Sequence, residues 1–358
     1  MTKFEETAWL PGLTTTAVGS LPHTDAADAV DLILRSLSNA PHAPQLSRSD
    51  PREQMWIQFS ENLPRFRVDL QNLTYHFDTT GDPESDVELF YSRYLDILDG
   101  ASADDFFVSP DFGRGIHVLL EKLAASGEKK KFIKVQVTGP LSFALTVTDE
   151  NRKPIFYHPL FKDVAVKAMG LKAIWLIEKF SPYAEKIIVF LDEPSLSAYG
   201  SSAFLGVSAT DVTEALDDVI AMVAGRGALP AVHCCGNTDW GLLMDSQIRV
   251  LNFDAVDYMD SLAIYPQKLN EFLTRGGALA WGAVANTPMV MNENADTVIK
   301  RIRDGVDMLE SKGIPRQLLT DRLMITPACG CAGLKLNETE QVYRIMKELD
   351  SKTISDIF

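Results

Sequence analysis

Eight short apolar segments, separated mostly by longer segments with helical periodicity, dominate the sequence. Segments such as residues 187–191, Ile-Ile-Val-Phe-Leu, do not alternate polar and apolar residues. Strands of that kind are typical of a parallel sheet that is buried on both faces. Eight of them with helices between predict a single (β/α)8 TIM barrel of the α/β class. The eight segments are residues 14–20, 43–46, 132–138, 186–191, 229–234, 250–253, 278–284 and 322–326.

Helix boundaries can be predicted at several places between these segments. Ser208 and Asp211 have the spacing of a capping box, and Asn337 and Glu340 predict the start of the final helix in the same way. Gly313 predicts the end of the helix that precedes it. These signals support the alternation of strands and helices.

One long insertion, residues 47–131, separates the second and third predicted strands. Helices are expected to begin in it near Pro51 and near Pro83. No Gly/Ser-rich or Pro-rich linker brackets the insertion. We therefore expect a helical excursion on the barrel, and one domain over residues 1–358.

Charge excludes two classes of partner. The chain has 34 Lys and Arg residues against 49 Asp and Glu residues, a formal net charge of −15. Nucleic acids and anionic lipid surfaces both require a positive footprint, so neither is expected to be bound. The first residues show no apolar segment behind a basic flank, and no apolar run is long enough to span a bilayer. The sequence predicts a cytoplasmic protein.

The placement of the four cysteines is more informative than their number. His233 and Cys235 lie two residues apart at the end of the fifth predicted strand, and Cys329 follows the eighth. Because strand ends meet at one mouth of a barrel, this imidazole and these two thiols could converge there. They form the ligand set that Zn²⁺ prefers, with one position open as in catalytic sites. Two alternatives stay open: cysteines that only pack, and a vicinal disulfide between Cys234 and Cys235.

Three further side chains at strand ends could complete a site. Asp192 follows the fourth predicted strand and could hold a ligand ammonium group, while Ser20, next to a glycine, could receive a carboxylate. Asp254 follows the sixth strand as a metal ligand, a hydrogen-bond partner of His233, or a helix cap. Each of the three could instead be an ordinary turn or cap residue.

Together these motifs resemble the C-terminal catalytic barrel of cobalamin-independent methionine synthase, within the superfamily that also holds uroporphyrinogen decarboxylase. The resemblance covers most of the chain and keeps the family's order. The motifs are Ala-Val-Gly-Ser-Leu-Pro at 17–22, Thr-Gly-Pro at 138–140, Asp-Glu-Pro at 192–194, His-x-Cys at 233–235 and Pro-x-Cys-Gly at 327–330.

The resemblance implies an enzyme that makes methionine from L-homocysteine with zinc. His233, Cys235 and Cys329 match the family's zinc ligands, and Asp254 is the nearest match to its fourth ligand, a glutamate. Asp192 matches the carboxylate that binds the homocysteine amino group. Ser20 matches the position that binds the amino-acid carboxylate, and Gln45 is the best candidate for the glutamate that completes this pocket.

The features in which this sequence differs from the family are those that serve the methyl donor. The resemblance covers only the family's C-terminal barrel, so we expect no N-terminal barrel here. The family's His-Ser-Pro reads Asn286-Thr287-Pro288, and its folate-contacting tryptophan corresponds to Thr146. Methyl transfer from tetrahydrofolate needs an acid for the departing amine, whereas a methyl group on cobalt leaves cob(I)alamin without a proton. The sequence therefore predicts methylcobalamin as donor, as in the short "core" methionine synthases. No Asp-x-His-x-x-Gly corrinoid motif is present, so the cobalamin would be free or held by a partner protein.

Other functions are weaker matches. A methyltransferase for another thiol, such as coenzyme M, would leave Asp192 without an amine to bind. A uroporphyrinogen decarboxylase would not require the cysteines, and it usually presents an arginine-rich N-terminal segment, whereas no arginine precedes Arg35 here. A non-catalytic zinc-storing or corrinoid-protein-docking barrel is the alternative from a different class.

Overall fold

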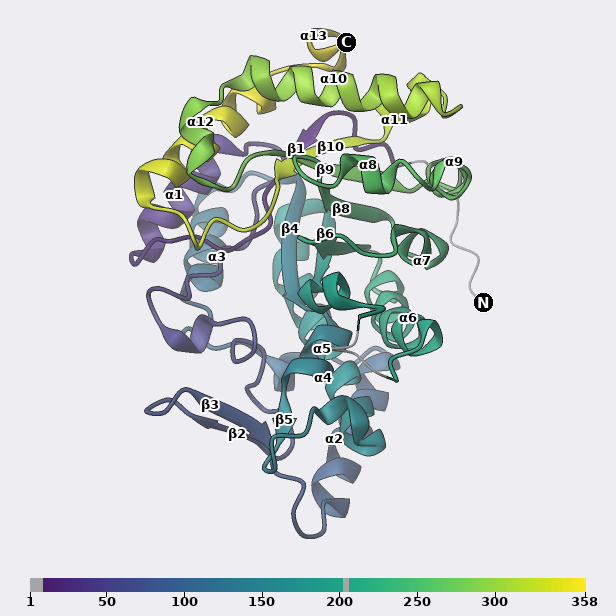
Figure 1. Cartoon of the computed structure of the whole chain (residues 1–358). Helices are drawn as coiled ribbons and strands as arrows, with labels where there is room; N and C mark the ends of the chain where they lie inside the picture. The colour runs from purple at the N-terminus through teal and green to yellow at the C-terminus, as the bar shows by residue number, and fades with distance from the viewer. Residues whose placement is uncertain (1–8, 202–205) are drawn as a thin grey trace.

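A curled parallel sheet of seven strands forms the centre of the computed structural model, which describes residues 9–201 and 206–358 (Figure 1). Every pairing between its neighbouring strands is parallel. The predicted parallel α/β architecture is confirmed in this sheet. In sheet order the strands are β1 (Thr14–Thr15), β10 (Leu323–Pro327), β9 (Ala278–Val284), β8 (Val250–Asp254), β7 (Leu229–Cys234), β6 (Ala184–Asp192) and β4 (Lys130–Thr138).

The second predicted strand, residues 43–46, is not a continuous strand. His42, directly before it, makes one bridge to Lys134 of β4, and a second bridge joins Gln45 to Ser20 beyond β1. Pro44 has no amide hydrogen to donate, which limits a regular ladder here. The prediction of eight strands is therefore corrected to seven strands and a bridged segment between the two edges of the sheet.

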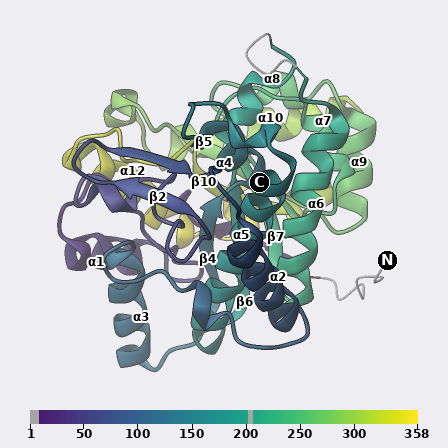
Figure 2. The ribbon, with the colours of Figure 1, turned by 90° about the horizontal axis from the view of Figure 1, so that it is seen from below.

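Helices surround the sheet. Helix α5 packs on β4 and β6, α6 on β7, α10 on β9, and α12 on β1 and β9. Figure 2 shows α6, α7 and α9 along one side of the strands and α1, α3 and α12 along the other. The helices are α1 (Ala26–Ser36), α2 (Glu84–Leu98), α3 (Arg114–Ser126), α4 (Pro140–Thr146), α5 (Pro159–Phe180), α6 (Ala209–Gly225), α7 (Trp240–Asp245), α8 (Met259–Leu262), α9 (Pro266–Thr274), α10 (Ala295–Ser311), α11 (Arg316–Asp321), α12 (Leu336–Asp350) and α13 (Ile354–Ile357).

Of the three helix boundaries predicted from capping signals between the strands, two are confirmed. Ser208 and Asp211 form the capping box of α6, and Gly313, with φ +94°, follows α10 in the left-handed conformation. The start predicted for the last long helix was wrong by two residues. Glu338, not Glu340, accepts the backbone N–H of Lys335 at 2.8 Å, so α12 already begins at Leu336. No helix in the described parts of the chain has both the length and the apolar character needed to cross a bilayer.

The insertion at residues 47–131 is only partly helical. It contains α2 and α3, but the segment at Pro51 is a single 3₁₀ turn, η1 (Pro51–Glu53), rather than the expected helix. The hairpin of β2 (Phe66–Asp69) and β3 (Thr74–Phe77) was not predicted. It pairs with β5 (Thr148–Asp149) in a small second sheet, at the lower left of Figure 1.

Side chains inside the curl change character along the strands. One cluster of buried apolar side chains gathers residues two apart, such as Ile188 and Phe190 of β6. Because side chains alternate along a strand, the next members of each inward row are Asp192 on β6, His233 on β7 and Asn252 on β8. The interior is therefore apolar at one end and polar at the carboxyl ends of the strands. The cluster consists of Ala40, Phe132, Ile188, Phe190, Leu229, Ala231, Val250, Ala280 and Met324.

Two motifs interlock at the ends of β4 and β6. The Glu193 carboxylate is fully buried and accepts the backbone N–H groups of Leu141 and Ser142 at 3.0 and 2.8 Å. A Cβ atom added to Gly139 would lie 2.2 Å from the Glu193 side chain. The glycine of Thr-Gly-Pro is therefore required by the glutamate of Asp-Glu-Pro.

We expect Gly139→Ala to lower the free energy of unfolding by about 1–3 kcal/mol, the usual cost of an overpacked interior. The cause is steric, because Gly139 has φ −61°, which alanine adopts without strain. Urea denaturation measures the effect. The matched control is Gly225→Ala, where an added Cβ meets nothing within 4 Å. Equal stability of both variants and the parent would contradict the packing argument.

Candidate metal centre

His233, Cys235 and Cys329 converge where β7 and β10 end. Their ligand atoms lie within 4.8 Å of one another, and Cys329 Sγ is 3.6 Å from His233 Nε2. His233 is only 3% exposed, and the two thiols are half-buried. The three residues come from segments almost one hundred positions apart, and the parallel sheet brings them together.

Electrostatics at the cluster favour one thiolate. The pKa of the Cys235 thiol is lowered to about 4, chiefly because Cys329 donates a hydrogen bond to its sulfur and, next, because the imidazole of His233 lies beside it. The pKa of the Cys329 thiol is raised, because it donates to Cys235 and is buried beside that negative charge. A thiolate, a thiol that can lose its proton and an imidazole nitrogen are a donor set that fits Zn²⁺.

In metal-free protein we expect iodoacetamide to alkylate Cys235 almost as fast at pH 6 as at pH 8. A thiol with a pKa of about 4 is already a thiolate at both values, and its reactivity falls only as the pH drops through 4. Cys234, whose pKa is raised to about 12 by burial, should not react. Mass spectrometry of the labelled peptides measures the rates, and Cys235→Ala is the control. A rate that rises about tenfold per pH unit from 6 to 8 would indicate an ordinary thiol.

The Asp192 carboxylate lies in register with His233 across β6 and β7. Its Oδ1 is buried and accepts no hydrogen bond from any residue that the structure describes. Burial raises the pKa of Asp192, while the nearby charges of Lys134 and His233 act in the opposite direction. A buried carboxylate oxygen without a donor is costly unless a ligand supplies one. A substrate ammonium group would do so.

Ser20 lies against the loop that carries Cys329. Its carbonyl accepts the N–H of Cys331 at 2.8 Å, and its Oγ lies 2.0 Å from where a Cβ on Gly330 would be. Gln45, bridged to Ser20, donates from Nε2 to Gln58 Oε1 at 2.8 Å. The structure thus places Ser20 against the two residues that follow Cys329, and a backbone bridge joins Gln45 to Ser20.

Asp254 caps the turn after β8. Its Oδ1 accepts the N–H groups of Val256 and Asp257 at 2.7 and 3.1 Å, and it is not among the three residues whose ligand atoms converge. The partner of His233 Nδ1 is instead Asn252, whose Oδ1 is 2.6 Å away. Asp254 Oδ1 thus caps a turn rather than a helix, and the role of Asp254 as a metal ligand stays a prediction.

Sequence reasoning missed two residues of the site, Asn252 and Glu193. Asn252 stands two positions before Asp254 on the same face of β8, and that spacing could have indicated it. The packing role of Glu193 could not be predicted from the sequence, because it depends on contact with Gly139, 54 positions earlier, and no local pattern connects the two residues.

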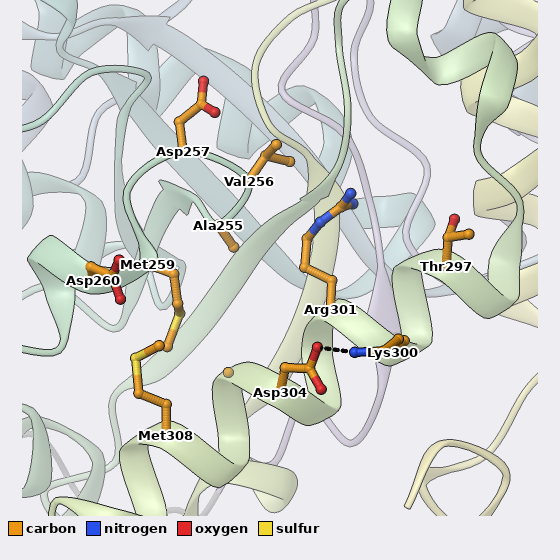
Figure 3. A pocket seen from close by; sticks show the side chains of 11 residues that line it. Ala255, Val256, Asp257, Met259, Asp260, Thr297, Lys300, Arg301, Asp304 and Met308 are labelled. Carbon is orange, nitrogen blue, oxygen red and sulfur yellow. Dashed lines mark hydrogen bonds and ion pairs between the residues drawn. The ribbon is translucent and has the colours of Figure 1, made fainter.

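A separate surface pocket of about 400 Å³ opens between the loop after β8 and α10 (Figure 3). Carboxylates, cations and two methionines line it, and Lys300 pairs with Asp304 at 2.5 Å. None of its lining residues is a cysteine or a histidine. It is therefore distinct in chemistry from the cluster of His233, Cys235 and Cys329.

The fold and the cluster define a class: curled parallel α/β sheets with nitrogen and sulfur donors at the carboxyl ends of the strands. Two solved structures of similar fold are a B12-independent methionine synthase from Shewanella sp. W3-18-1 in complex with selenomethionine and a methyltransferase from Methanosarcina mazei. The first is 16% identical to this chain with a TM-score of 0.54, and the alignment covers 95% of this chain and 96% of the synthase chain. The second is 15% identical with a TM-score of 0.54, and the alignment covers 95% of this chain and 94% of the methyltransferase chain.

Neither a protein-family model nor a curated protein sequence matches the chain. At these identities the likeness concerns the fold. The resemblance that the motifs predicted is confirmed at that level, because the structural neighbours include a methionine synthase and a methyltransferase.

Proposed function

We propose that the protein is a zinc-dependent methyltransferase that makes methionine from L-homocysteine, with a methylcorrinoid as donor. The observation that carries the proposal is the convergence of His233, Cys235 and Cys329 beside the unpaired carboxylate oxygen of Asp192. A methionine synthase and a methyltransferase among the proteins of similar fold support a role in methyl transfer.

Different residues serve metal binding and substrate binding. His233, Cys235 and Cys329 hold the ion, and bound zinc would supply a Lewis acid that keeps a coordinated thiol deprotonated at neutral pH. Asp192 binds the ammonium group of the amino-acid substrate through a charge-assisted hydrogen bond. Ser20, whose Oγ lies against Gly330 next to Cys329, is our candidate for binding the substrate carboxylate.

The side chains near the cluster favour a donor that needs no acid. Asn286 donates from its amide to Gly330 O at 3.4 Å, beside Cys329, and an amide has no proton to give at neutral pH. When the homocysteine sulfur attacks a methyl group on cobalt, the S–C bond forms and the electron pair of the broken Co–C bond stays on cobalt. No leaving group has to be protonated, so Asn286 is compatible with this donor.

The function is tested by incubating zinc-loaded protein and L-homocysteine with methylcobalamin, and in parallel with methyltetrahydrofolate, and quantifying methionine. We expect methionine from methylcobalamin only, and none with the Cys329→Ala variant. Methionine from methyltetrahydrofolate would contradict our interpretation of Asn286. Zinc binding without methionine from either donor would contradict the proposed reaction and favour a binding role.

A second assay tests the acceptor. Coenzyme M carries a thiol but no amine, and would leave the Asp192 oxygen unpaired in a buried site. We therefore expect homocysteine to be preferred over coenzyme M in kcat/KM. The reverse preference would move the assignment to another thiol methyltransferase.

A further inference from the structure

Asn252 is a fully buried side chain at the centre of the polar end of the curl. It lies on β8, and its amide reaches three other strands. Oδ1 is 2.6 Å from His233 Nδ1 on β7, while Nδ2 donates to Ala280 O on β9 and to Thr326 Oγ1 on β10, both at 2.8 Å. Every hydrogen-bonding atom of the amide is therefore used at least once.

The orientation of this amide follows from its partners. The backbone carbonyl of Ala280 can only accept a hydrogen bond, so the nitrogen of Asn252 must face it. The amide oxygen is then the atom that faces His233 Nδ1, and an amide oxygen can only accept. His233 Nδ1 must therefore carry a proton.

We propose that Asn252 is a positioning residue that fixes the Nδ1-protonated tautomer of His233 and so presents the Nε2 lone pair to the metal. In neutral imidazole one nitrogen donates and the other accepts, so a proton held on Nδ1 leaves Nε2 free. Nε2 is the atom that lies 3.6 Å from Cys329 Sγ, inside the cluster. The role in metal binding rests on the proposed zinc site, whereas the tautomer is a property of the chain alone.

The same side chain couples the two halves of the ligand set. Thr326 accepts from Asn252 and lies on β10, three residues before Cys329, while His233 lies near the end of β7. One amide thus connects the strands that supply the imidazole and the second thiol. A leucine at position 252 would keep the branching at Cγ, with a somewhat larger volume, but would make none of these bonds.

The tautomer is tested in metal-free protein whose histidines are labelled with ¹⁵N. Two-bond ¹H–¹⁵N correlation spectra distinguish the two neutral tautomers, and the signals of His233 are assigned by their loss in His233→Gln. We expect the Nδ1-protonated form in the parent and in Thr326→Val, which removes one contact of Asn252 but leaves its bond to His233. In Asn252→Leu we expect a mixture in which the Nε2-protonated form is substantially populated.

Zinc affinity is measured on the same variants by competition with a chromophoric chelator. Loss of an outer partner of a histidine ligand typically weakens metal binding by about 10–100-fold, so we expect this range for Asn252→Leu and less than about threefold for Thr326→Val. Asn252→Asp retains an acceptor for Nδ1 and is expected to keep the parent's tautomer. It serves as the test if the leucine variant does not fold.

Two results would overturn the inference. One is an Asn252→Leu protein that keeps a single Nδ1-protonated tautomer, and the other is an Asn252→Asp protein that loses it. If the parent binds no zinc, the proposed function fails, but the spectra of the metal-free protein still decide whether Asn252 sets the tautomer.

Discussion

We expect the Cys329→Ala protein to retain no zinc after dialysis, whereas the parent retains one ion per chain. The substitution removes one of three converging ligand atoms and leaves His233 and Cys235 without the second sulfur. The loss of affinity should exceed the roughly 10–100-fold that removal of an outer partner causes, because a direct ligand is lost. Atomic emission spectroscopy of the dialysed protein measures the ion.

The matched control is Cys331→Ala. This cysteine lies two positions further along the chain and is buried, and burial raises the pKa of its thiol to about 12. Its sulfur is not among the ligand atoms that converge with His233 and Cys235, so its loss should leave one zinc per chain. If both variants kept one zinc per chain, Cys329 would not be a ligand. If only Cys331→Ala lost its zinc, Cys331 and not Cys329 would be the second sulfur ligand.

The central sheet could be predicted because buried parallel strands have an unambiguous pattern. Residues 187–191 form part of β6, and the other long apolar runs lie in β4, β7, β8, β9 and β10. The segment at 43–46 is not a strand, because only isolated bridges connect it to its neighbours. The apolar character of a segment does not indicate how many such bridges it will form. The hairpin of β2 and β3 could not be predicted, since its four-residue strands are half exposed and carry charged residues such as Arg67 and Asp69.

The cluster of His233, Cys235 and Cys329 could be predicted because a local motif and a rule of the fold both indicate it. The residues around the cluster could not be predicted in this way. His233 and Cys235 are a local pair, and the rule that active sites lie at strand ends adds Cys329. Asp254 illustrates the limit, because a carboxylate after a strand is equally compatible with a ligand and a cap. Its Oδ1 receives two backbone N–H groups, a detail that only the path of the turn determines.

The Asp192→Asn protein is expected to keep its zinc but to require far more homocysteine. Removing one partner of a buried charged pair costs about 2–5 kcal/mol, so KM for homocysteine should rise by roughly 30-fold or more. The asparagine is nearly isosteric and can still accept a hydrogen bond from the ammonium group, but it lacks the charge. Steady-state kinetics with methylcobalamin measure KM, and metal analysis confirms that the ion stays bound.

Glu193→Gln is the control for this prediction, because it makes the same chemical change on the next residue. The Glu193 carboxylate faces the backbone of α4, where it accepts from Leu141 and Ser142, so its loss should affect stability rather than KM. A substrate without the amino group, 4-mercaptobutanoic acid, separates charge recognition from distortion of the site. The parent and Asp192→Asn should use it equally poorly if Asp192 acts on the amine. An unchanged KM for homocysteine in Asp192→Asn would remove Asp192 from the substrate site, and its unpaired oxygen would then have to serve another ligand.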